Sequence, residues 1–586
     1  MNVITRTRPE AVEIAAAWLQ EFGKALEAGS MDAALRCVAA DGHWRDVLAF
    51  TWMVRTFTGA QEIAAALAPR LGIARPHGFV LPAHRSAPRH VRRAGVDCIE
   101  AIFSFETTVG RADGVVRLVE QPDGAWRAWT LLTTLEELRG YPDGRPKAMS
   151  DAEKFSRDFG GENWADQRRR AQAYEGRDPA VLVVGGGQAG LSAAARLGHL
   201  GVDTLVIDRE ERIGDNWRKR YHSLTLHNEV HVNHLPLMPF PPTFPVFIPK
   251  DKLANWFEHY VDSLDINFWT GTELAGGTWD EAEKRWTVRL KRSDGSERTM
   301  RPRHIVVATG VSGKPIWPHI PGLDGFKGEV LHSGSYTTGA AWKGRNAVVI
   351  GTGNSGHDVA QDLCASGAHV TMVQRSPTYV VSIREAQKVY AIYTEGLPFE
   401  DCDLLACSWP YPVLRRAYQL STAEMREVDS ALHEGLRKRG FRLTFGEDDT
   451  GFQMMYLRRG GGYYFNVGCS DMIVDGRIGL LQYDDLDGFT ADGLKLKDGG
   501  SKPVDLVVVA TGYETQQAFV RDTLGDAVAD RIGPVWGFDG GGELRNMWAP
   551  TPQDGLWFTA GSLAQCRIYS RYLALQIKAR EDGLVA

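Results

Sequence analysis

The sequence predicts an α/β protein in which two parallel-sheet units follow a small α+β domain. Short Val- and Ile-rich runs recur after Pro179 and end in glycine or a polar residue, as expected for strands buried on both faces of a parallel sheet. These runs lie at 180–187, 203–210, 303–310, 345–353, 369–375 and 505–512. Two of them lead through a glycine-rich turn into a helical pattern, at Gly185 and at Gly351. Before residue 138 the order differs, because helical stretches precede alternating, strand-like runs.

The composition is that of an ordinary globular protein. The chain has 586 residues, of which 43% are hydrophobic and 24% charged, and this length suggests about three to five domains. The net charge of −6 provides no basic excess that would indicate a nucleic acid or an anionic membrane as partner. No uncharged apolar stretch reaches about 18 residues, and Glu10 and Glu13 interrupt the N-terminal segment. We therefore expect neither a membrane span nor a signal peptide.

The cysteines and histidines point to neither a disulfide framework nor a metal site. The seven cysteines are scattered and include no Cys-x-x-Cys, which favours a reducing, cytoplasmic location. Five histidines lie in or near a Pro-rich segment without helical i, i+4 pairs beside a carboxylate, so we expect no metal ligands among them. They are His222, His227, His231, His234 and His259.

The first 138 residues are expected to form the small α+β domain. Residues 11–29 have apolar side chains at helical spacing, and a second helical stretch begins at Met31. Strand-like alternation marks 96–110, 114–121 and 125–135. This order, together with Trp-Arg-Asp at 44–46, resembles the nuclear-transport-factor-2 (NTF2)/SnoaL-like fold. We expect a structural or homodimer-forming role; a small-ligand site that uses His43 and Asp46 is the alternative.

The first glycine motif predicts a dinucleotide site. It runs Gly185-Gly-Gly187-Gln188-Ala189-Gly190, between a strand and an apolar helix. Such glycines allow a tight turn, a close approach of the backbone to a pyrophosphate, and close packing of the helix on the strand. The helix N-terminus presents free N–H groups to the phosphates. Asp208, followed by Arg209, ends the second strand, and a carboxylate there binds ribose hydroxyls and repels a 2′-phosphate, which favours FAD or NAD.

The second glycine motif predicts a site for a different dinucleotide. It runs Gly351-Thr-Gly353-Asn354-Ser355-Gly356, again between a strand and a helix. Its second strand ends in Gln374 and Arg375 rather than in an acid. Because arginine can pair with a 2′-phosphate, the first site is assigned to FAD and the second to NADPH.

Two further strand ends support a pair of nested Rossmann-type dinucleotide-binding domains. Ala308-Thr309-Gly310 and Ala510-Thr511-Gly512 each follow an apolar strand, and the glycine leaves room for a dinucleotide. The predicted organisation is an NTF2/SnoaL-like domain at 1–138, a polar linker with a helical middle at 139–178, and the first part of the FAD-binding domain at 179–340. An NADPH-binding domain with a helical insertion at 341–500 and the second part of the FAD-binding domain at 501–586 complete it.

A further motif between these two units carries a family resemblance. Phe326, Gly328, His332 and Tyr336 match F-x-G-x-x-x-H-x-x-x-(F/Y). Over roughly 179–586 the chain therefore resembles the class B flavoprotein monooxygenases, which include flavin-containing monooxygenases, Baeyer–Villiger monooxygenases and N-hydroxylases. With its N-terminal extension it resembles the type II and YUCCA-like members. Type II members choose loosely between NADPH and NADH, so NADH is the alternative cofactor.

The resemblance also implies roles for individual residues. Asp215, Asn216 and Trp217 would lie along the isoalloxazine. Asn228 would face the flavin and help to hold the oxygenated intermediate, although His227 fits the same position. Independently of the resemblance, His332 lies in a Gly-rich loop that leads into the second unit, and we expect it to brace the hinge or to hydrogen-bond the backbone near the bound nicotinamide; direct proton transfer is the alternative. The helix that starts at Ser562 and Gln565 would approach the flavin ring, where its dipole stabilises negative charge.

The implied function is an FAD- and NADPH-dependent monooxygenase that forms a C4a-(hydro)peroxyflavin and transfers one atom of O2 to a small organic substrate. Tyr336 departs from the Trp-Pro or Trp-Asp that typical Baeyer–Villiger enzymes have at this point, which favours N- or S-oxidation over Baeyer–Villiger oxidation of ketones. An uncoupled NADPH oxidase shares every motif. A binding or assembly protein with residual redox function is the alternative from another class. A disulfide reductase is disfavoured because no cysteine pair is present.

Overall fold

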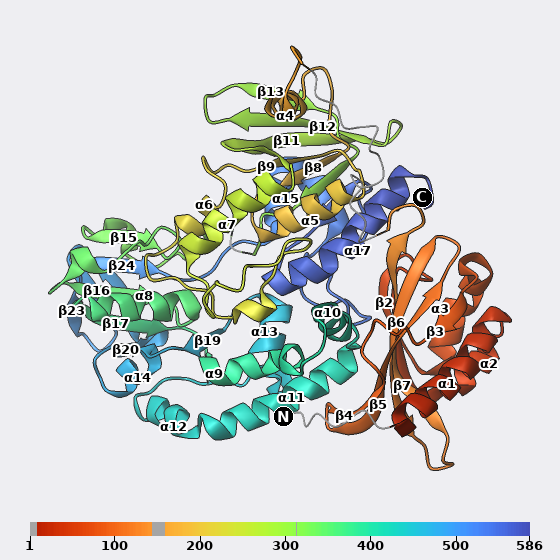
Figure 1. The fold of residues 1–586 in the computed structure, drawn as a ribbon. Coiled ribbons are helices and arrows are strands. Elements are labelled where there is room, and N and C mark those ends of the chain that lie inside the picture. Colours follow the sequence, from red (N-terminus) through yellow and green to blue (C-terminus); the bar gives the residue numbers. More distant parts are fainter. Residues whose placement is uncertain (1–8, 143–158, 312, 586) are drawn as a thin grey trace.

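Strand pairing separates the chain into an N-terminal sheet and two parallel sheets (Figure 1). The computed structural model describes residues 9–142, 159–311 and 313–585. None of the helices in these three ranges is long and apolar enough to cross a membrane.

The N-terminal domain packs three helices on one seven-stranded sheet. The helices are α1 Pro9–Glu27, α2 Met31–Arg36 and α3 Gly59–Ala74. The sheet has the order β2-β1-β7-β6-β5-β3, with β4 paired to β5. Its strands are β1 Val38–Val47, β2 Val54–Thr58, β3 His77–Val80, β4 Arg89–Arg93, β5 Val96–Glu106, β6 Gly110–Glu120 and β7 Trp126–Leu138. The predicted helices and the last three strands are present, whereas β1 to β4 and α3 were not predicted; the likeness to the NTF2/SnoaL-like fold stays a prediction.

Aromatic side chains fill the space between these helices and the sheet. Trp18 stacks on Phe22 with ring centroids 4.6 Å apart, and Phe79 stacks on Phe105 at 5.0 Å. Asp46 is fully buried on this sheet and accepts hydrogen bonds from Thr51 and Thr133. Its carboxylate therefore already has its hydrogen-bond partners inside the domain. The predicted linker contains α4 Trp164–Ala173, and its residues 143–158 lie outside the described part.

The first parallel sheet has the order β10-β9-β8-β14-β25. Its strands are β8 Val181–Val184, β9 Thr204–Ile207, β10 Asn267–Trp269, β14 His304–Val307 and β25 Leu556–Phe558. Helices α5 Gln188–His199 and α17 Leu563–Glu581 pack against each other beside it. A three-stranded sheet of β11 Thr272–Asp280, β12 Arg285–Arg292 and β13 Glu297–Met300 extends this unit. Central strands such as β8, β9 and β14 are fully buried, which explains their uninterrupted apolar sequence.

The second parallel sheet has the order β15-β24-β16-β17-β20. Its strands are β15 Glu329–His332, β16 Asn346–Ile350, β17 His369–Gln374, β20 Gly479–Gln482 and β24 Leu506–Val509, with α8 Asn354–Ala365 packed on β16 and β17. Strand β24 pairs with both β15 and β16. The boundaries predicted at 340/341 and 500/501 would assign β15 and β24 to the FAD-binding domain. By strand pairing, both strands belong to the sheet of the second unit.

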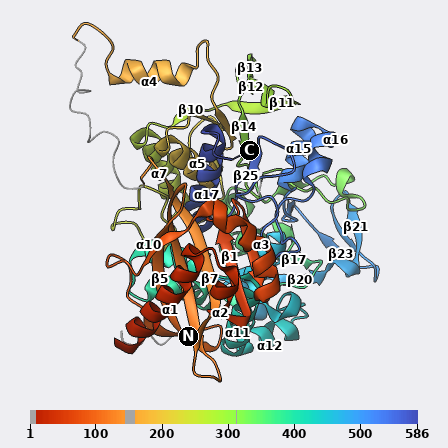
Figure 2. The same cartoon turned by 90° about the vertical axis from the view of Figure 1, so that its right-hand side faces the viewer.

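A helical insertion leaves the second unit after β17 and lies between it and the N-terminal domain (Figure 1; Figure 2). Its main helices are α9 Ile383–Ala386, η6 Gln387–Thr394, α10 Phe399–Cys407, α11 Tyr411–Val428, α12 Ser430–Lys438, α13 Gly451–Arg459 and α14 Cys469–Val474. Strands β18 Tyr379–Ser382 and β19 Tyr463–Asn466 pair within it. The minor elements elsewhere are α6 Asp215–Arg218, α7 Lys250–Ser263, α15 Gln516–Leu524, α16 Asp526–Ile532, β21 Leu486–Thr490, β22 Gly493–Leu496 and β23 Ser501–Pro503.

Buried ion pairs dock the N-terminal domain on the rest of the molecule. Arg45 of β1 binds Glu543 through two hydrogen bonds, of 2.9 and 2.7 Å. Arg93 of β4 pairs with Glu395, which follows η6, at 2.6 Å. The hydroxyl of Tyr572 in α17 donates to Glu136 of β7 at 3.0 Å. Since a buried charge is stable only with its partner, these pairs fix the position of the domain.

Candidate functional site

The first glycine motif forms a tight strand–turn–helix junction between β8 and α5. Gly185 has φ +111°, and a Cβ there would lie 2.6 Å from the carbonyl oxygen of Ala308. A Cβ on Gly190 would lie 1.9 Å from the carbonyl oxygen of Gly185. Gly187 is the N-cap of α5 and, lacking a side chain, makes no side-chain cap. The junction therefore has the shape that a pyrophosphate at a helix N-terminus requires, with Ala189 buried in the first turn of the helix.

Asp208 stands beside this junction, at the end of β9. Its Oδ2 accepts a hydrogen bond from the Gly186 N–H at 2.6 Å, and its Oδ1 accepts one from the Glu210 N–H at 2.9 Å. Burial raises the pKa of Asp208, and the two backbone hydrogen bonds partly offset this effect. Arg209 points elsewhere, since its side chain is largely exposed and donates to the Gly313 carbonyl at 3.4 Å. Asp208 thus has the position expected of a ribose ligand.

A chain of hydrogen bonds joins the first glycine motif to the C-terminal helix. The indole Nε1 of Trp217 donates to Gln188 Oε1 at 3.2 Å, and Gln188 Nε2 donates to the Gly561 carbonyl at 3.2 Å. A Cβ on Gly187 would lie 2.9 Å from Nδ2 of Asn216, which places Asn216 against the motif. The Asp215 carboxylate instead pairs with Arg218 and, at 3.4 Å, with Lys219. Asn216, Trp217 and Gln188 therefore lie together at the first glycine motif, whereas the Asp215 carboxylate is paired with the neighbouring cations of α6 and its C-terminal end.

The second glycine motif lines a cavity of about 1270 Å³, here called the second-motif cavity. Its glycines repeat the geometry of the first motif: a Cβ on Gly351 would lie 2.4 Å from the Ala510 carbonyl oxygen, and one on Gly356 would lie 2.2 Å from that of Gly351. Predicted residues that line the cavity are Gly351, Gly353, Asn354, Ser355, Gly356, Arg375, Ala510, Thr511 and Gly512. Ala308, Thr309 and Gly310 lie at the corresponding strand end of the first unit, where β14 passes beside Gly185.

Gln374, the last residue of β17, and Arg375, which follows it, have different surroundings. Arg375 is exposed in the second-motif cavity, and no carboxylate of the described residues pairs with it. Gln374 is fully buried; it accepts a hydrogen bond from the Arg442 N–H at 2.8 Å and donates to the Arg442 carbonyl at 2.9 Å. Arg375 is thus available to an anionic ligand, and Gln374 is not brought to the cavity.

The residues of the Phe326–Tyr336 motif support the fold. The Tyr336 hydroxyl donates to Asp362 Oδ2 of α8 at 2.6 Å, and the ring lies in the core of the second unit. His332 ends β15, is buried, and packs edge-on against Tyr513 at 5.1 Å. Burial lowers the pKa of His332, which keeps the ring neutral near pH 7. Neither Tyr336 nor His332 lines the second-motif cavity, although Ser333 does.

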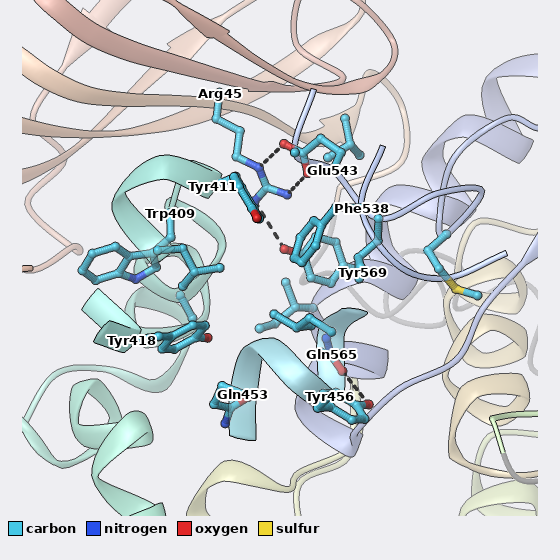
Figure 3. Close-up of a pocket in the computed structure, with 18 of the residues that line it drawn as sticks. Arg45, Trp409, Tyr411, Tyr418, Gln453, Tyr456, Phe538, Glu543, Gln565 and Tyr569 are labelled. Atoms are coloured by element: carbon cyan, nitrogen blue, oxygen red, sulfur yellow. Dashed lines mark hydrogen bonds and ion pairs between the residues drawn. The ribbon is translucent and has the colours of Figure 1, made fainter. Parts of the chain in front are cut away.

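A second large space, here called the interdomain cavity, lies where the N-terminal domain, the helical insertion and the C-terminal segment meet (Figure 3). Its volume is about 1030 Å³. Ser562 and Gln565, at the start of α17, line it; their side chains form a reciprocal cap at the helix N-terminus. Gln565 Oε1 also accepts a hydrogen bond from the Tyr456 hydroxyl of α13 at 3.0 Å. The predicted flavin-facing end of α17 therefore opens on this cavity.

Asn228 reaches the same cavity through one neighbour. Its Nδ2 donates to the Tyr390 hydroxyl at 3.2 Å, and Gln453 Nε2 donates to the same hydroxyl at 3.4 Å. Tyr390 and Gln453 line the interdomain cavity, and burial raises the pKa of Tyr390. Asn228 itself is buried, and its carbonyl accepts a hydrogen bond from Asn233 Nδ2 at 2.8 Å. Asn228 thus belongs to an amide–phenol cluster at the edge of the cavity.

Sequence reasoning missed the side chains that make up this cavity. Tyr390, Gln453 and Tyr456 lie in helices that carry no motif, Tyr569 lies beyond the predicted start of α17, and Arg45 comes from the other end of the chain. The one available pattern was the i, i+3 pair Gln453 and Tyr456, which places both side chains on one face of α13.

The two glycine motifs fit two dinucleotides of different kinds. Each has a glycine turn closed against an Ala-Thr-Gly strand end, and a helix N-terminus directed at the turn. The first has a carboxylate at the ribose position and the second an arginine that is exposed to its cavity. Such a pair suits one bound redox cofactor and one exchangeable reductant that carries a 2′-phosphate.

Comparisons with known proteins agree with this geometry. The family model described as pyridine nucleotide-disulphide oxidoreductase matches residues 179–395. The chain is 31% identical over 338 residues to indole-3-pyruvate monooxygenase YUCCA1 of Oryza sativa subsp. japonica, covering 58% of this chain and 77% of that protein. It is 30% identical to the probable indole-3-pyruvate monooxygenase YUCCA4 of Arabidopsis thaliana, covering 58% and 76%. An open crystal structure of cyclohexanone monooxygenase, 19% identical, has a TM-score of 0.52 and covers 69% of this chain and 88% of that chain, which confirms the predicted α/β fold with two Rossmann-type domains.

Proposed function

Because the chain belongs to the class B flavin monooxygenases, the family of the YUCCA proteins, we propose that it uses FAD, NADPH and O2 to place one oxygen atom on a small organic substrate. When bound, the flavin supplies hydride acceptance and oxygen activation; the protein supplies binding sites, orientation and exclusion of water.

The observation that carries this proposal is that the second-motif cavity and the interdomain cavity both lie beside the first dinucleotide-binding unit. Helix α13 separates them: Tyr456 and Leu457 line the interdomain cavity, and Arg458 and Arg459 line the second-motif cavity. The second-motif cavity reaches Gln516, which donates to the Val307 carbonyl of β14 at 3.2 Å. The interdomain cavity reaches Ser562, next to Gly561. A reductant and a substrate can therefore approach one flavin from different sides.

Residues of this chain would hold the flavin between these cavities. The Gly185–Gly190 turn and Asp208 would bind the pyrophosphate and ribose, and Trp217 would lie at the ring through its bond to Gln188. The N-terminus of α17 directs free N–H groups and a positive dipole end toward the same region, which favours negative charge there. Aromatic walls on the interdomain side would keep water from the reacting atoms.

The reacting group of the substrate is proposed to be a carbonyl. The sequence favoured N- or S-oxidation because of Tyr336, but the hydroxyl of that residue is bound to Asp362 and lines neither cavity. Tyr336 therefore carries no information about the substrate. The relatives from Oryza sativa and Arabidopsis thaliana are named for indole-3-pyruvate, a 2-oxo acid, which supports a carbonyl substrate first and a soft nitrogen or sulfur atom second.

Labelled oxygen tests the proposal. We expect the purified flavoprotein, given NADPH, 18O2 and panels of ketones, 2-oxo acids, sulfides and amines, to form a product that carries one 18O atom. NADPH consumption should match product formation. NADPH oxidation that yields only hydrogen peroxide with every substrate would instead identify an oxidase, and no NADPH oxidation would contradict both readings.

Arg375→Gln is expected to raise the KM for NADPH by about 10- to 100-fold and to leave the KM for NADH nearly unchanged. An arginine–phosphate hydrogen-bonded pair contributes about 1.5–3 kcal/mol, and Arg375 is exposed in the second-motif cavity without a carboxylate partner among the described residues. The KM for each nucleotide is measured from the steady-state rate of NADPH or NADH oxidation.

Arg442→Gln is the matched control for this substitution. Arg442 is also a partly exposed arginine near the end of β17, but it pairs with Asp484 at 2.9 Å and does not line the cavity. Its removal should change neither KM. Equal losses for NADPH and NADH in Arg375→Gln would show that the residue does not recognise a 2′-phosphate.

Asn228→Ala is expected to lower the yield of oxygenated product per NADPH by about 5- to 30-fold, with a matching rise in hydrogen peroxide. The change removes a buried amide donor and leaves the Tyr390 hydroxyl with one donor fewer at the wall of the interdomain cavity, a loss of about 1–2 kcal/mol. Product and peroxide are measured together. Tyr390→Phe, which removes only the shared hydroxyl, should show a smaller effect in the same direction; full coupling in both variants would exclude this cluster from catalysis.

A further inference from the structure

The N-terminal domain contributes one wall of the interdomain cavity. Met53, Val54 and Arg55, at the start of β2, line it together with residues 92–95 of the β4–β5 turn. We propose that this cavity is the substrate chamber, that it takes a molecule with a flat apolar ring system, and that the N-terminal domain selects the size of that ring. This inference rests on the proposed function, since it concerns the substrate of the same reaction.

The remaining walls come from distant parts of the chain. The helical insertion contributes aromatic side chains that include Trp409, Tyr411 and Tyr418, and the C-terminal segment contributes Phe538, Trp548 and Tyr569. Figure 3 shows Trp409 and Tyr418 on one side of the space and Phe538 and Tyr569 on the other, with Gln565 at the end near α13. A volume of about 1030 Å³ exceeds what a diatomic gas or a three-carbon ketone needs and fits a ring system with room to orient.

The aromatic side chains are held as surfaces against which a ring can pack. Tyr411 packs edge-on against Phe538 with centroids 4.7 Å apart, and Tyr569 stacks on Trp548 at 4.4 Å. The Arg117 guanidinium lies 4.5 Å from the centroid of the Trp409 ring, so the N-terminal sheet orients this wall as well. Offset and edge-to-face contacts with an aromatic ligand therefore favour its binding beyond the burial of its apolar surface.

The buried charges at the chamber are already paired, which leaves its inner surface to apolar ligands. Arg45 is held by Glu543, and Arg93 by Glu100 and Glu395. The exposed cations among the lining residues are Arg55, Arg92, Lys388 and Arg545. A ring would therefore lie inside, and a polar or anionic end of the molecule would point outward.

The N-terminal wall is a fixed surface. Strand β2 is in register with β1, with Val54 opposite Val47, and Arg45 on β1 is joined to Glu543 of the C-terminal segment. Val54 is half-buried, so a larger side chain at this position extends into the chamber. Filling this wall should exclude a bulky ring without touching either glycine motif.

The experiment measures binding of 2-acetylnaphthalene to the oxidised, flavin-loaded protein, without NADPH, through the change in flavin absorbance. We expect Val54→Trp to raise the Kd at least tenfold because the indole occupies the ring site. Met53→Ala, which leaves the fold less disturbed, should raise the Kd about three- to tenfold through the lost contact. Val80→Trp is the matched control, since Val80 is 51% exposed on β3 of the same domain and does not line the chamber; its Kd should equal that of the wild type.

Two outcomes would overturn the inference. One is wild-type affinity in both Val54→Trp and Met53→Ala, which would place the ring elsewhere. The other is no binding of the probe by the wild-type protein, which would exclude flat aromatic ligands. Because the measurement needs no turnover, a protein that binds the probe as expected but incorporates no 18O would contradict only the proposed function.

Discussion

Gly190→Ala is expected to give a protein that retains less than about a tenth of the flavin bound by the wild type. A Cβ at this position would lie 1.9 Å from the carbonyl oxygen of Gly185 and 3.2 Å from Cγ1 of Val183. Since both contacts are with the strand–turn junction itself, α5 must move away from the turn that is proposed to bind the pyrophosphate. A loss of about 1.4 kcal/mol suffices for a tenfold change in affinity, and overpacking in a tight core costs about 1–3 kcal/mol or more.

Gly198→Ala on the same helix is the matched control. A Cβ there would meet nothing within 4 Å, and the position is exposed, so alanine should stabilise α5 by about 0.5–1 kcal/mol and leave flavin content unchanged. The ratio of flavin to protein absorbance after purification measures both variants. Full flavin content in Gly190→Ala would show that the first glycine motif is not the flavin site.

Positions such as Gly190 could be predicted from the sequence because the constraint on them is local. A tight strand–turn–helix junction fixes the spacing of its glycines within six residues, and the strand before it is recognisable from its uninterrupted apolar run. The central strands of both parallel sheets were predicted for the same reason. The boundaries at 340/341 and 500/501 were not, because β15 and β24 enter the second sheet through pairing with β16, which no local pattern encodes.

The residue types at a site were predictable where one chemistry dominates, and less so where a side chain has several uses. A carboxylate after β9 and an arginine after β17 lie at the motifs as expected. The side chains of Gln374 and Tyr336 do not line the second-motif cavity. A buried amide and a buried phenol need hydrogen-bond partners, and these two residues have theirs in Arg442 and Asp362. Sequence spacing gives the place of such a residue in the chain, but not the direction of its side chain.

The interdomain cavity lies beyond what a single sequence can predict. Its walls come from β2, the helical insertion and α17, and the contacts between them join residues far apart in the sequence, such as Tyr456 and Gln565, which are 109 positions apart. The link from Arg45 to Glu543 is one of these. The sequence shows Arg45 only as part of the Trp-Arg-Asp stretch. Its role in docking the N-terminal domain depends on Glu543, which lies near the other end of the chain.

Glu543→Ala is expected to destabilise the docking of the N-terminal domain by about 3–5 kcal/mol. Glu543 accepts two hydrogen bonds from the Arg45 guanidinium and a third, at 2.9 Å, from the Thr56 hydroxyl. Burial would lower the pKa of Arg45, but the charge and hydrogen bond of Glu543, together with Tyr569 and Cys407, outweigh it and raise that pKa, so Arg45 stays charged. Without Glu543 the charge is buried and uncompensated. Amide hydrogen exchange of β1 should become faster by roughly a hundred- to a few-thousand-fold if opening of the domain governs it.

Two comparisons separate this effect from a general loss of stability. Asp97→Ala removes the partner of Arg92 in an ion pair whose side chains are 59% and 78% exposed, so it should cost less than about 1 kcal/mol. Replacing both members of the buried pair, Arg45→Met with Glu543→Leu, should recover most of the protection, because the burial of an unpaired charge is then removed. If the double variant is as unstable as Glu543→Ala alone, packing rather than charge holds the N-terminal domain against the chamber. In that case the wall formed by β2 would depend on the shape of the side chains at positions 45 and 543 and not on their ionisation.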